Sequence, residues 1–175
     1  MKTGMIIKFI ILLFLSSPAF AGGFIGVSVN HLKINDGYKY ESNYQPSFNF
    51  GYNLILDNWV LSASTNRFLN QSVERKATKN NITYNSKSKL LADTFSIGYR
   101  INRFVISPFL VNATVDKSLY YNDRKLGSTH TTSILSGLNL TYFIDKNISI
   151  SSAYVAPNQE QSLESGLVLG INYNF

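Results

Sequence analysis

Apolar and polar residues alternate with a period of two in eight separate segments of this sequence. In one of them, Phe48, Phe50 and Tyr52 alternate with Asn49 and Gly51. This period places the apolar side chains on one face of a β-strand and contradicts a helix. The sequence therefore predicts eight strands, at about residues 23–34, 47–56, 59–66, 90–101, 104–115, 132–144, 148–155 and 166–175.

The connections between these segments are alternately short and long. Tight turns are predicted at Asp57-Asn58, Asn102-Arg103 and Asp145-Lys146-Asn147, whose residue types favour turns. The longer polar segments are residues 35–46, 69–89, 116–131 and 156–164. This asymmetry is typical of membrane barrels, and no segment after the N-terminus is apolar enough for a spanning helix. We expect an all-β fold, an eight-stranded antiparallel up-and-down transmembrane β-barrel formed by residues 22–175.

Alternation alone does not say which face is outside, because a secreted lipocalin-like barrel would alternate too. The polar face consists almost wholly of Gly, Ser, Thr and Asn, which suit a narrow, side-chain-filled lumen better than a water-facing surface. We therefore predict that the apolar face contacts lipid; in the fifth strand this face would carry Phe109, Val111, Ala113 and Val115. Aromatic residues near the turns would form an interfacial girdle, namely Trp59, Tyr99, Phe104, Tyr142, Tyr173 and Phe175.

Residues 1–21 have the pattern of a signal peptide. Lys2 and Lys8 give a positive start, residues 9–15 are apolar, and Ala19 and Ala21 supply the small residues of a cleavage site. The apolar run is short for a retained membrane anchor, which is the alternative interpretation. The chain has no cysteine, which excludes disulfide-stapled folds and cysteine-based metal sites.

Residues 22–29, 136–143, 147–150 and 166–175 resemble the small outer-membrane β-barrel proteins, which include opacity-type, OmpA-type and porin-family barrels. The resemblance covers the whole chain after residue 21. It implies the outer membrane of a Gram-negative cell. Ile171, Tyr173 and Phe175 also resemble the C-terminal signal that the barrel assembly machinery reads, and the resemblance makes that machinery a partner during biogenesis.

No catalytic constellation is evident from the residues. The chain has two histidines, His31 and His130, and Ser133 would lie on the opposite face of its strand from His130. Residues 157–164 resemble the end of outer-membrane lipid A deacylases, but the His-x-Ser-Asn element expected before it is replaced by Ser149-Ile150-Ser151-Ser152. A lipid A-modifying enzyme and a narrow porin-family channel remain alternatives. We expect no cofactor and no metal site.

Surface interaction is the function that this reasoning favours, with a structural role or an adhesin-like, opacity-like role at the cell surface. Basic residues are concentrated in the predicted loop at 69–89, namely Arg75, Lys76, Lys79, Lys87 and Lys89. One interpretation is that this basic segment is only a solvated loop. Otherwise its cations would contact phosphates of lipopolysaccharide. We expect a monomer surrounded by outer-membrane lipid and lipopolysaccharide, a host or surface ligand at the long loops, and no nucleic acid. The candidate contact residues are Arg67, Arg75, Lys76, Lys79 and Lys87.

Overall fold

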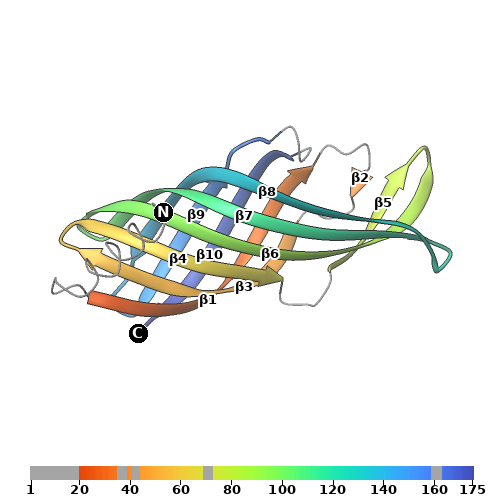
Figure 1. Ribbon diagram of the computed structural model, residues 1–175. Coiled ribbons are helices and arrows are strands. Elements are labelled where there is room, and N and C mark those ends of the chain that lie inside the picture. Colours follow the sequence, from red (N-terminus) through yellow and green to blue (C-terminus); the bar gives the residue numbers. More distant parts are fainter. Residues whose placement is uncertain (1–19, 35–38, 41–43, 69–72, 159–162) are drawn as a thin grey trace, which may run out of the picture.

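The computed structural model describes residues 20–34, 39–40, 44–68, 73–158 and 163–175, which form an antiparallel barrel (Figure 1). The predicted signal peptide falls almost wholly on residues 1–19, outside the described residues. No helix in the described ranges is long and apolar enough to cross a membrane. The barrel strands are β1 (Phe20–Ile34), β3 (Tyr44–Leu56), β4 (Trp59–Phe68), β6 (Ile82–Ile101), β7 (Phe104–Tyr121), β8 (Arg124–Phe143), β9 (Ile148–Val155) and β10 (Leu163–Asn174).

Hydrogen-bonded pairing closes these eight strands into a ring. Each barrel strand pairs with the next one along the chain, and β1 pairs with β10. Two further strands, β2 (Lys39–Tyr40) and β5 (Val73–Lys79), lie outside the ring; β5 pairs with the first part of β6, and β2 pairs with β5. β4 pairs with β6 as far as Leu91, and β5 pairs with β6 from Ser88 onwards. β5 therefore lies along the same edge of β6 as β4, beyond the end of β4. The eight-stranded prediction is confirmed.

The short turns lie where the sequence predicts them. Asp57 and Asn102 have positive φ angles of 54° and 55°, a conformation that Asn and Asp adopt more readily than most residues. The side chain of Asp145 accepts hydrogen bonds from the backbone N–H groups of Asn147 and Ile148 at 2.7 and 2.8 Å, which fixes the third turn.

Two of the predicted long loops are strands instead. Residues 73–79 form β5, residues 82–89 extend β6, and residues 116–131 belong to β7, β8 and their connection. The prediction of polar loops at 69–89 and 116–131 is therefore wrong for these parts. Polar residues form strands here because each segment pairs with a neighbour over its length, so the backbone hydrogen bonds are satisfied without an apolar face.

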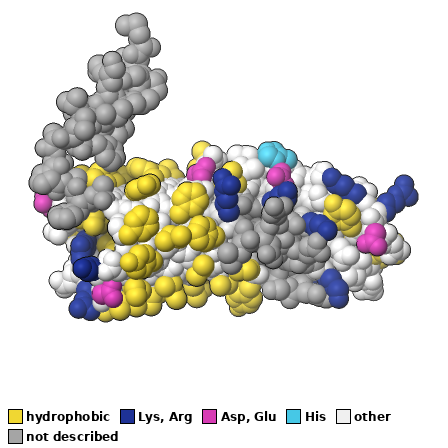
Figure 2. Space-filling view, turned by 90° about the horizontal axis from the view of Figure 1, so that it is seen from below, with side chains coloured by type: hydrophobic (Ala, Val, Ile, Leu, Met, Phe, Trp, Pro, Cys, Tyr) yellow, Lys and Arg dark blue, Asp and Glu magenta, His cyan; other side chains and the backbone are white. Residues whose placement is uncertain are grey.

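An apolar belt surrounds the barrel on its outside. Outward side chains such as Phe95, Leu138 and Leu169 are more than half exposed, and hydrophobic side chains gather in this part of the surface (Figure 2). The belt runs from Ile134 on β8 to Ile144, one residue beyond the end of this strand, which is about 34 Å along the extended chain and about 26 Å across a membrane at a typical tilt. That height matches the apolar band of outer-membrane barrels.

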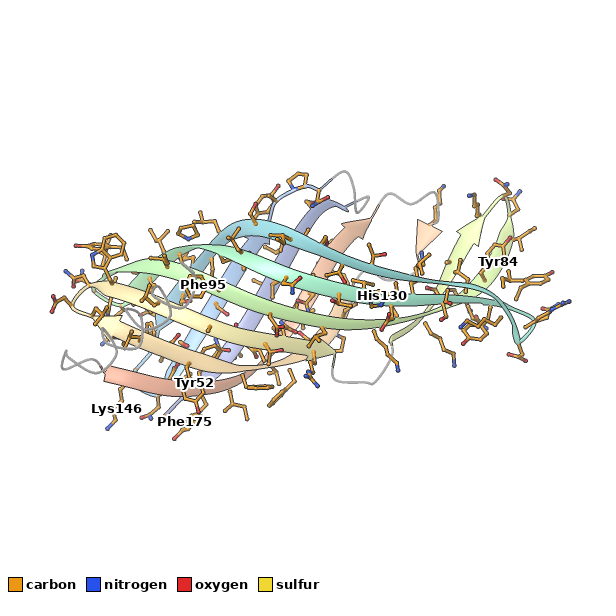
Figure 3. All side chains as sticks on the ribbon, in the orientation of Figure 1. Tyr52, Tyr84, Phe95, His130, Lys146 and Phe175 are labelled. Atoms are coloured by element: carbon orange, nitrogen blue, oxygen red, sulfur yellow. The ribbon has the colours of Figure 1, made fainter. Side chains whose placement is uncertain are left out.

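Aromatic side chains border the belt at the short-turn end, as predicted. Trp59 and Tyr99 are register partners with ring centroids 5.3 Å apart, and Phe104 and Tyr142 are partners at 4.9 Å. Phe175 lies at the same end and is 69% exposed (Figure 3). These rings form the girdle expected at a membrane interface.

The predicted facing of β7 is wrong. Phe109, Val111 and Ala113 are buried inside the barrel, whereas Ile106 and Leu110 face outward at 45% and 55% exposure. Both faces of this strand are apolar, so its own alternation is ambiguous. The neighbouring strands decide the matter, because Leu110 is the register partner of the outward Phe95.

The lumen is not filled by side chains, which corrects a second expectation. It contains a cavity of about 740 Å³. The inward residues are mostly short, such as Ser62, Ser64, Ser96, Ser107 and Ser151, and side chains of that length do not reach across the barrel.

Candidate surface site on the protruding strands

Four paired strands project beyond the apolar belt. We call residues 73–89 of β5 and β6 and residues 116–131 of β7 and β8 the arm; Figure 1 shows it at the right. Two-residue hairpins connect its strands, with positive φ at both Asn80 and Asn81 and at both Asn122 and Asp123. Positive φ at both central residues is characteristic of the type I′ turn, which suits the right-handed twist of the strands. The arm is thus a continuous extension of the barrel wall.

Register determines which arm residues share the outward face. Lys76 of β5 pairs with Asn85 of β6, Asn85 pairs with Tyr120 of β7, and Tyr120 pairs with Lys125 of β8. Lys87 and Lys89 occupy the next outward positions on β6, opposite Ser118 and Asp116. The strand geometry therefore separates Lys87 from Lys89 by about 7 Å, and Lys76 and Lys125, on β5 and β8, lie farther from them.

Two contacts join side chains on this face. The Lys87 Nζ lies 5.5 Å from the centroid of the Tyr120 ring, within the range of a cation–π interaction. The His130 Nδ1 lies 2.5 Å from Asp116 Oδ1. Because both members of that pair are more than half exposed, the interaction is open to solvent and adds little stability.

The predicted lipopolysaccharide-contact residues do not all share one face. Arg67, Lys76 and Lys87 lie at outward register positions. Lys79 pairs with Ile82, and Arg75 pairs with Ser86. Both pairs lie at the inward register positions, which alternate with the outward ones. Arg67 is exposed at the end of β4, opposite Leu91, and therefore lies lower than the arm cations, next to the belt.

Sequence reasoning missed two residues of this face, Tyr120 and Lys125, and it assigned Lys89 to a loop and not to a strand. The signal was present in the sequence, because Asn85, Lys87 and Lys89 alternate with Ser86 and Ser88. A period of two without apolar residues is easily taken for a polar loop.

The histidines and Ser133 do not assemble a hydrolase site. His130 is on the outward face of the arm, whereas Ser133 lines the lumen, as the sequence predicts. His31 stacks on Tyr44 with ring centroids 4.6 Å apart. In the described part of the chain no hydroxyl group is hydrogen-bonded to either histidine, and no three His, Asp or Glu residues there are grouped to hold a metal ion.

The three residues of the predicted assembly signal follow the seam where the barrel closes. Ile171 and Tyr173 pair with Val27 and Ile25 of β1, and all four side chains face outward. The backbone N–H of Phe175 donates to the carbonyl oxygen of Gly23 at 2.9 Å.

These features define a class of protein, the small outer-membrane β-barrel. In fold the chain is similar to Ail, the attachment invasion locus protein of Yersinia pestis, with a TM-score of 0.64 and 20% identity over 89% of this chain and 97% of Ail. Ail in complex with the heparin analogue sucrose octasulfate gives a TM-score of 0.62, with the same identity and coverage. Neisserial surface protein A gives a TM-score of 0.52 at 12% identity, over 91% of this chain and 100% of that protein.

No protein-family model matches the sequence, and no curated protein is significantly similar to it. The structural similarity therefore establishes the fold, an antiparallel barrel of the type found in outer membranes. The chain's own apolar belt and aromatic girdle agree with that location.

Proposed function

We propose that this protein is an adhesin-like surface protein whose arm binds anionic polysaccharide. The observation that carries the proposal is the charge of the arm: residues 73–89 and 116–131 contain eight Lys or Arg residues and three Asp or Glu residues. Lys and Arg are visible on the arm in Figure 2, beyond the apolar belt. Sulfates and phosphates carried on a sugar polymer have the charge that such a face attracts.

The geometry of the arm supports an extended ligand over a single ion. Its outward cations come from β5, β6 and β8, and the paired strands hold their backbone positions in place. A polymer with repeated negative charges can contact several of these cations at once, and that adds affinity without a deep pocket. The crystal structure of Ail with sucrose octasulfate shows that another barrel of this fold binds a sulfated heparin analogue.

The two sources of anionic sugar are lipopolysaccharide in the same membrane and sulfated glycans outside the cell. Arg67 lies beside the belt, opposite Leu91, where lipopolysaccharide phosphates would be within its reach, and the arm cations lie farther from the membrane, where they would meet a soluble ligand. Lys76, Lys87, Lys89 and Lys125 should therefore govern binding of soluble heparin, whereas Arg67 should govern association with lipopolysaccharide.

The test uses the refolded barrel in lipid nanodiscs and measures binding of heparin and of purified lipopolysaccharide. Replacing the four arm lysines with Gln should weaken heparin binding about fourfold or more, because each exposed ion pair contributes roughly 0.2–1 kcal/mol. Binding should also weaken as salt rises. The matched control removes charge from the other end of the barrel, with Arg103→Gln and Lys146→Gln. Equal heparin affinity in the arm variant and the control would refute the proposal.

A further inference from the structure

The barrel encloses a cavity that the surface function does not use. Its volume is about 740 Å³, within the range of about 300–1,000 Å³ that small-molecule sites occupy. Its lining extends from Phe24, near the short turns, to Leu119 on the inner face of the arm. The cavity thus runs along the lumen towards the arm end of the barrel.

One wall of the cavity is apolar. Phe109, Val111 and Ala113 of β7, Ala92 of β6 and Val155 of β9 form one buried cluster, against which Leu135, Ala153 and Val168 pack. Such a wall inside a membrane barrel is not needed for contact with lipid, because the apolar belt on the outside serves that purpose. An apolar group placed against this wall would be removed from water.

The adjoining wall is polar and carries unused hydrogen-bond acceptors. The Asn49 Nδ2 donates to Asn172 Oδ1 at 2.7 Å, and the Asn66 Nδ2 donates to Ser28 Oγ at 3.4 Å. The Oδ1 atoms of Asn49 and Asn66 and the Oγ of Ser88 are buried with no hydrogen-bond partner among the described residues, and all three residues line the cavity. A buried acceptor without a partner is costly, so a rotation of these side chains that presents an acceptor to a donor group in the cavity would be favoured.

Register places the polar and apolar walls next to each other. Asn49 pairs with Asn66, Asn66 pairs with Ala92, and Ala92 pairs with Ala113, on four neighbouring strands. One small molecule can therefore lie against the Asn49 and Asn66 side chains while its apolar body packs on the β7 wall.

Charge restricts the class of ligand further. Lys117 is the one charged residue in the described lining of the cavity, and it lies at the arm end, four residues beyond Ala113. An ion deeper in the lumen would find no counter-charge among the described lining residues, which makes its transfer from water unfavourable.

We propose that the lumen is a binding site for an uncharged small molecule that has an apolar body and an O–H or N–H donor. Aromatic and medium-chain alcohols and indoles have this chemistry. On binding, the Asn49 and Asn66 side chains turn their carbonyl oxygens towards the cavity and accept the ligand's hydrogen bond, and the apolar body packs on Phe109 and Val111. This site is independent of the outward arm face.

Indole is a suitable probe because it combines an apolar ring with one N–H donor. We would titrate indole and 1-methylindole, which lacks the donor, into the full barrel in nanodiscs and follow binding by ligand-observed NMR. Indole should bind at least fivefold more tightly than 1-methylindole. Equal affinities would overturn the assignment of the acceptor wall.

Matched Ala→Phe substitutions test whether the binding site lies inside the barrel. Ala113→Phe and Ala92→Phe fill the cavity and should each weaken indole binding at least tenfold, whereas Ala63→Phe adds the same ring on the outer surface and should leave binding unchanged. Equal binding by the inner and outer variants would overturn the proposal. In the unaltered protein, nuclear Overhauser effects from indole to the methyl groups of Val111 and Leu135 provide a test that needs no variant, and their absence at saturating indole would also overturn it.

Discussion

Replacing Gly26 with Ala should destabilise the barrel, because this glycine lies beneath a hydrogen bond that crosses β1. Gly26 is the register partner of Asn172 on β10 and of Asn49 on β3, and these two side chains are joined at 2.7 Å. A Cβ on Gly26 would lie 2.8 Å from Asn49 Oδ1, and under 3.0 Å from Asn172 Oδ1 and from the carbonyl oxygen of Ile171. The last of these atoms belongs to the backbone, so β1 and β10 would have to separate locally.

The expected loss follows from three effects. Overpacking costs roughly 1–3 kcal/mol. Loss of the hydrogen bond between Asn49 and Asn172 costs about 0.5–1.5 kcal/mol. The reduced freedom of the unfolded chain offsets about 0.4–1 kcal/mol of this. The free energy of unfolding should therefore fall by about 0.5–4 kcal/mol.

Gly127→Ala is the matched control, since a Cβ there would meet no atom within 4 Å. Unfolding of both variants by urea in lipid vesicles can be followed by fluorescence of Trp59, the single tryptophan of the chain. The Gly127 variant should be as stable as the parent or slightly more stable. A loss for Gly26→Ala that is indistinguishable from that of the control would refute the argument, because it would show that the strands adjust without cost.

Three further predictions concern the membrane, assembly and the arm. Trp59 is 54% exposed in the girdle, so lipids brominated near the headgroup should quench its fluorescence more than lipids brominated at the chain ends; the reverse order would contradict the belt placement. Phe175→Ala should slow insertion, measured as appearance of the heat-modifiable band on gels, whereas Lys146→Ala should not; equal rates would remove the proposed role of Phe175 in assembly. Asn81→Ala forces alanine to adopt a φ of 63° at a cost of about 1–2 kcal/mol, so hydrogen exchange should accelerate in β5 and the adjoining part of β6, whereas Asn81→Gly should exchange like the parent.

The membrane-spanning part of the fold could be predicted from the sequence because one face of each strand had to be apolar. Phe95, Ile97 and Tyr99 alternate with Thr94, Ser96 and Gly98, and the structure places the first set outside and the second inside. The girdle was predictable for the same reason: aromatic residues such as Trp59 and Phe104 directly follow the short turns.

The arm was not predicted because both of its faces are polar. Strand pairing there is held by backbone hydrogen bonds, which leave no hydrophobic period in the sequence. The available clue was turn chemistry, since Asn80-Asn81 and Asn122-Asp123 are residue pairs that accept positive φ at both positions of a two-residue hairpin.

The facing of β7 and the state of the lumen could not be read from one strand at a time. Both sides of β7 are apolar, and the register with Phe95 on β6 decides which side contacts lipid. Turning Phe109, Val111 and Ala113 inward also creates the apolar wall of the cavity. Small polar residues suit the inside of a barrel, but their volume determines whether the lumen is filled, and Ser and Ala side chains leave it hollow.

The outer arm face and the lumen are separated by one residue step along the same strands. On β7, odd-numbered residues from Val105 to Leu119 face the lumen, and the even-numbered Asp116, Ser118 and Tyr120 face outward. The register is pinned below the arm by paired outward residues such as Phe95 and Leu110. A substitution on one face should therefore leave the residues of the other face in their positions. For that reason, loss of heparin binding with indole binding intact, and the reverse for Ala113→Phe, would assign two separate sites to one set of strands.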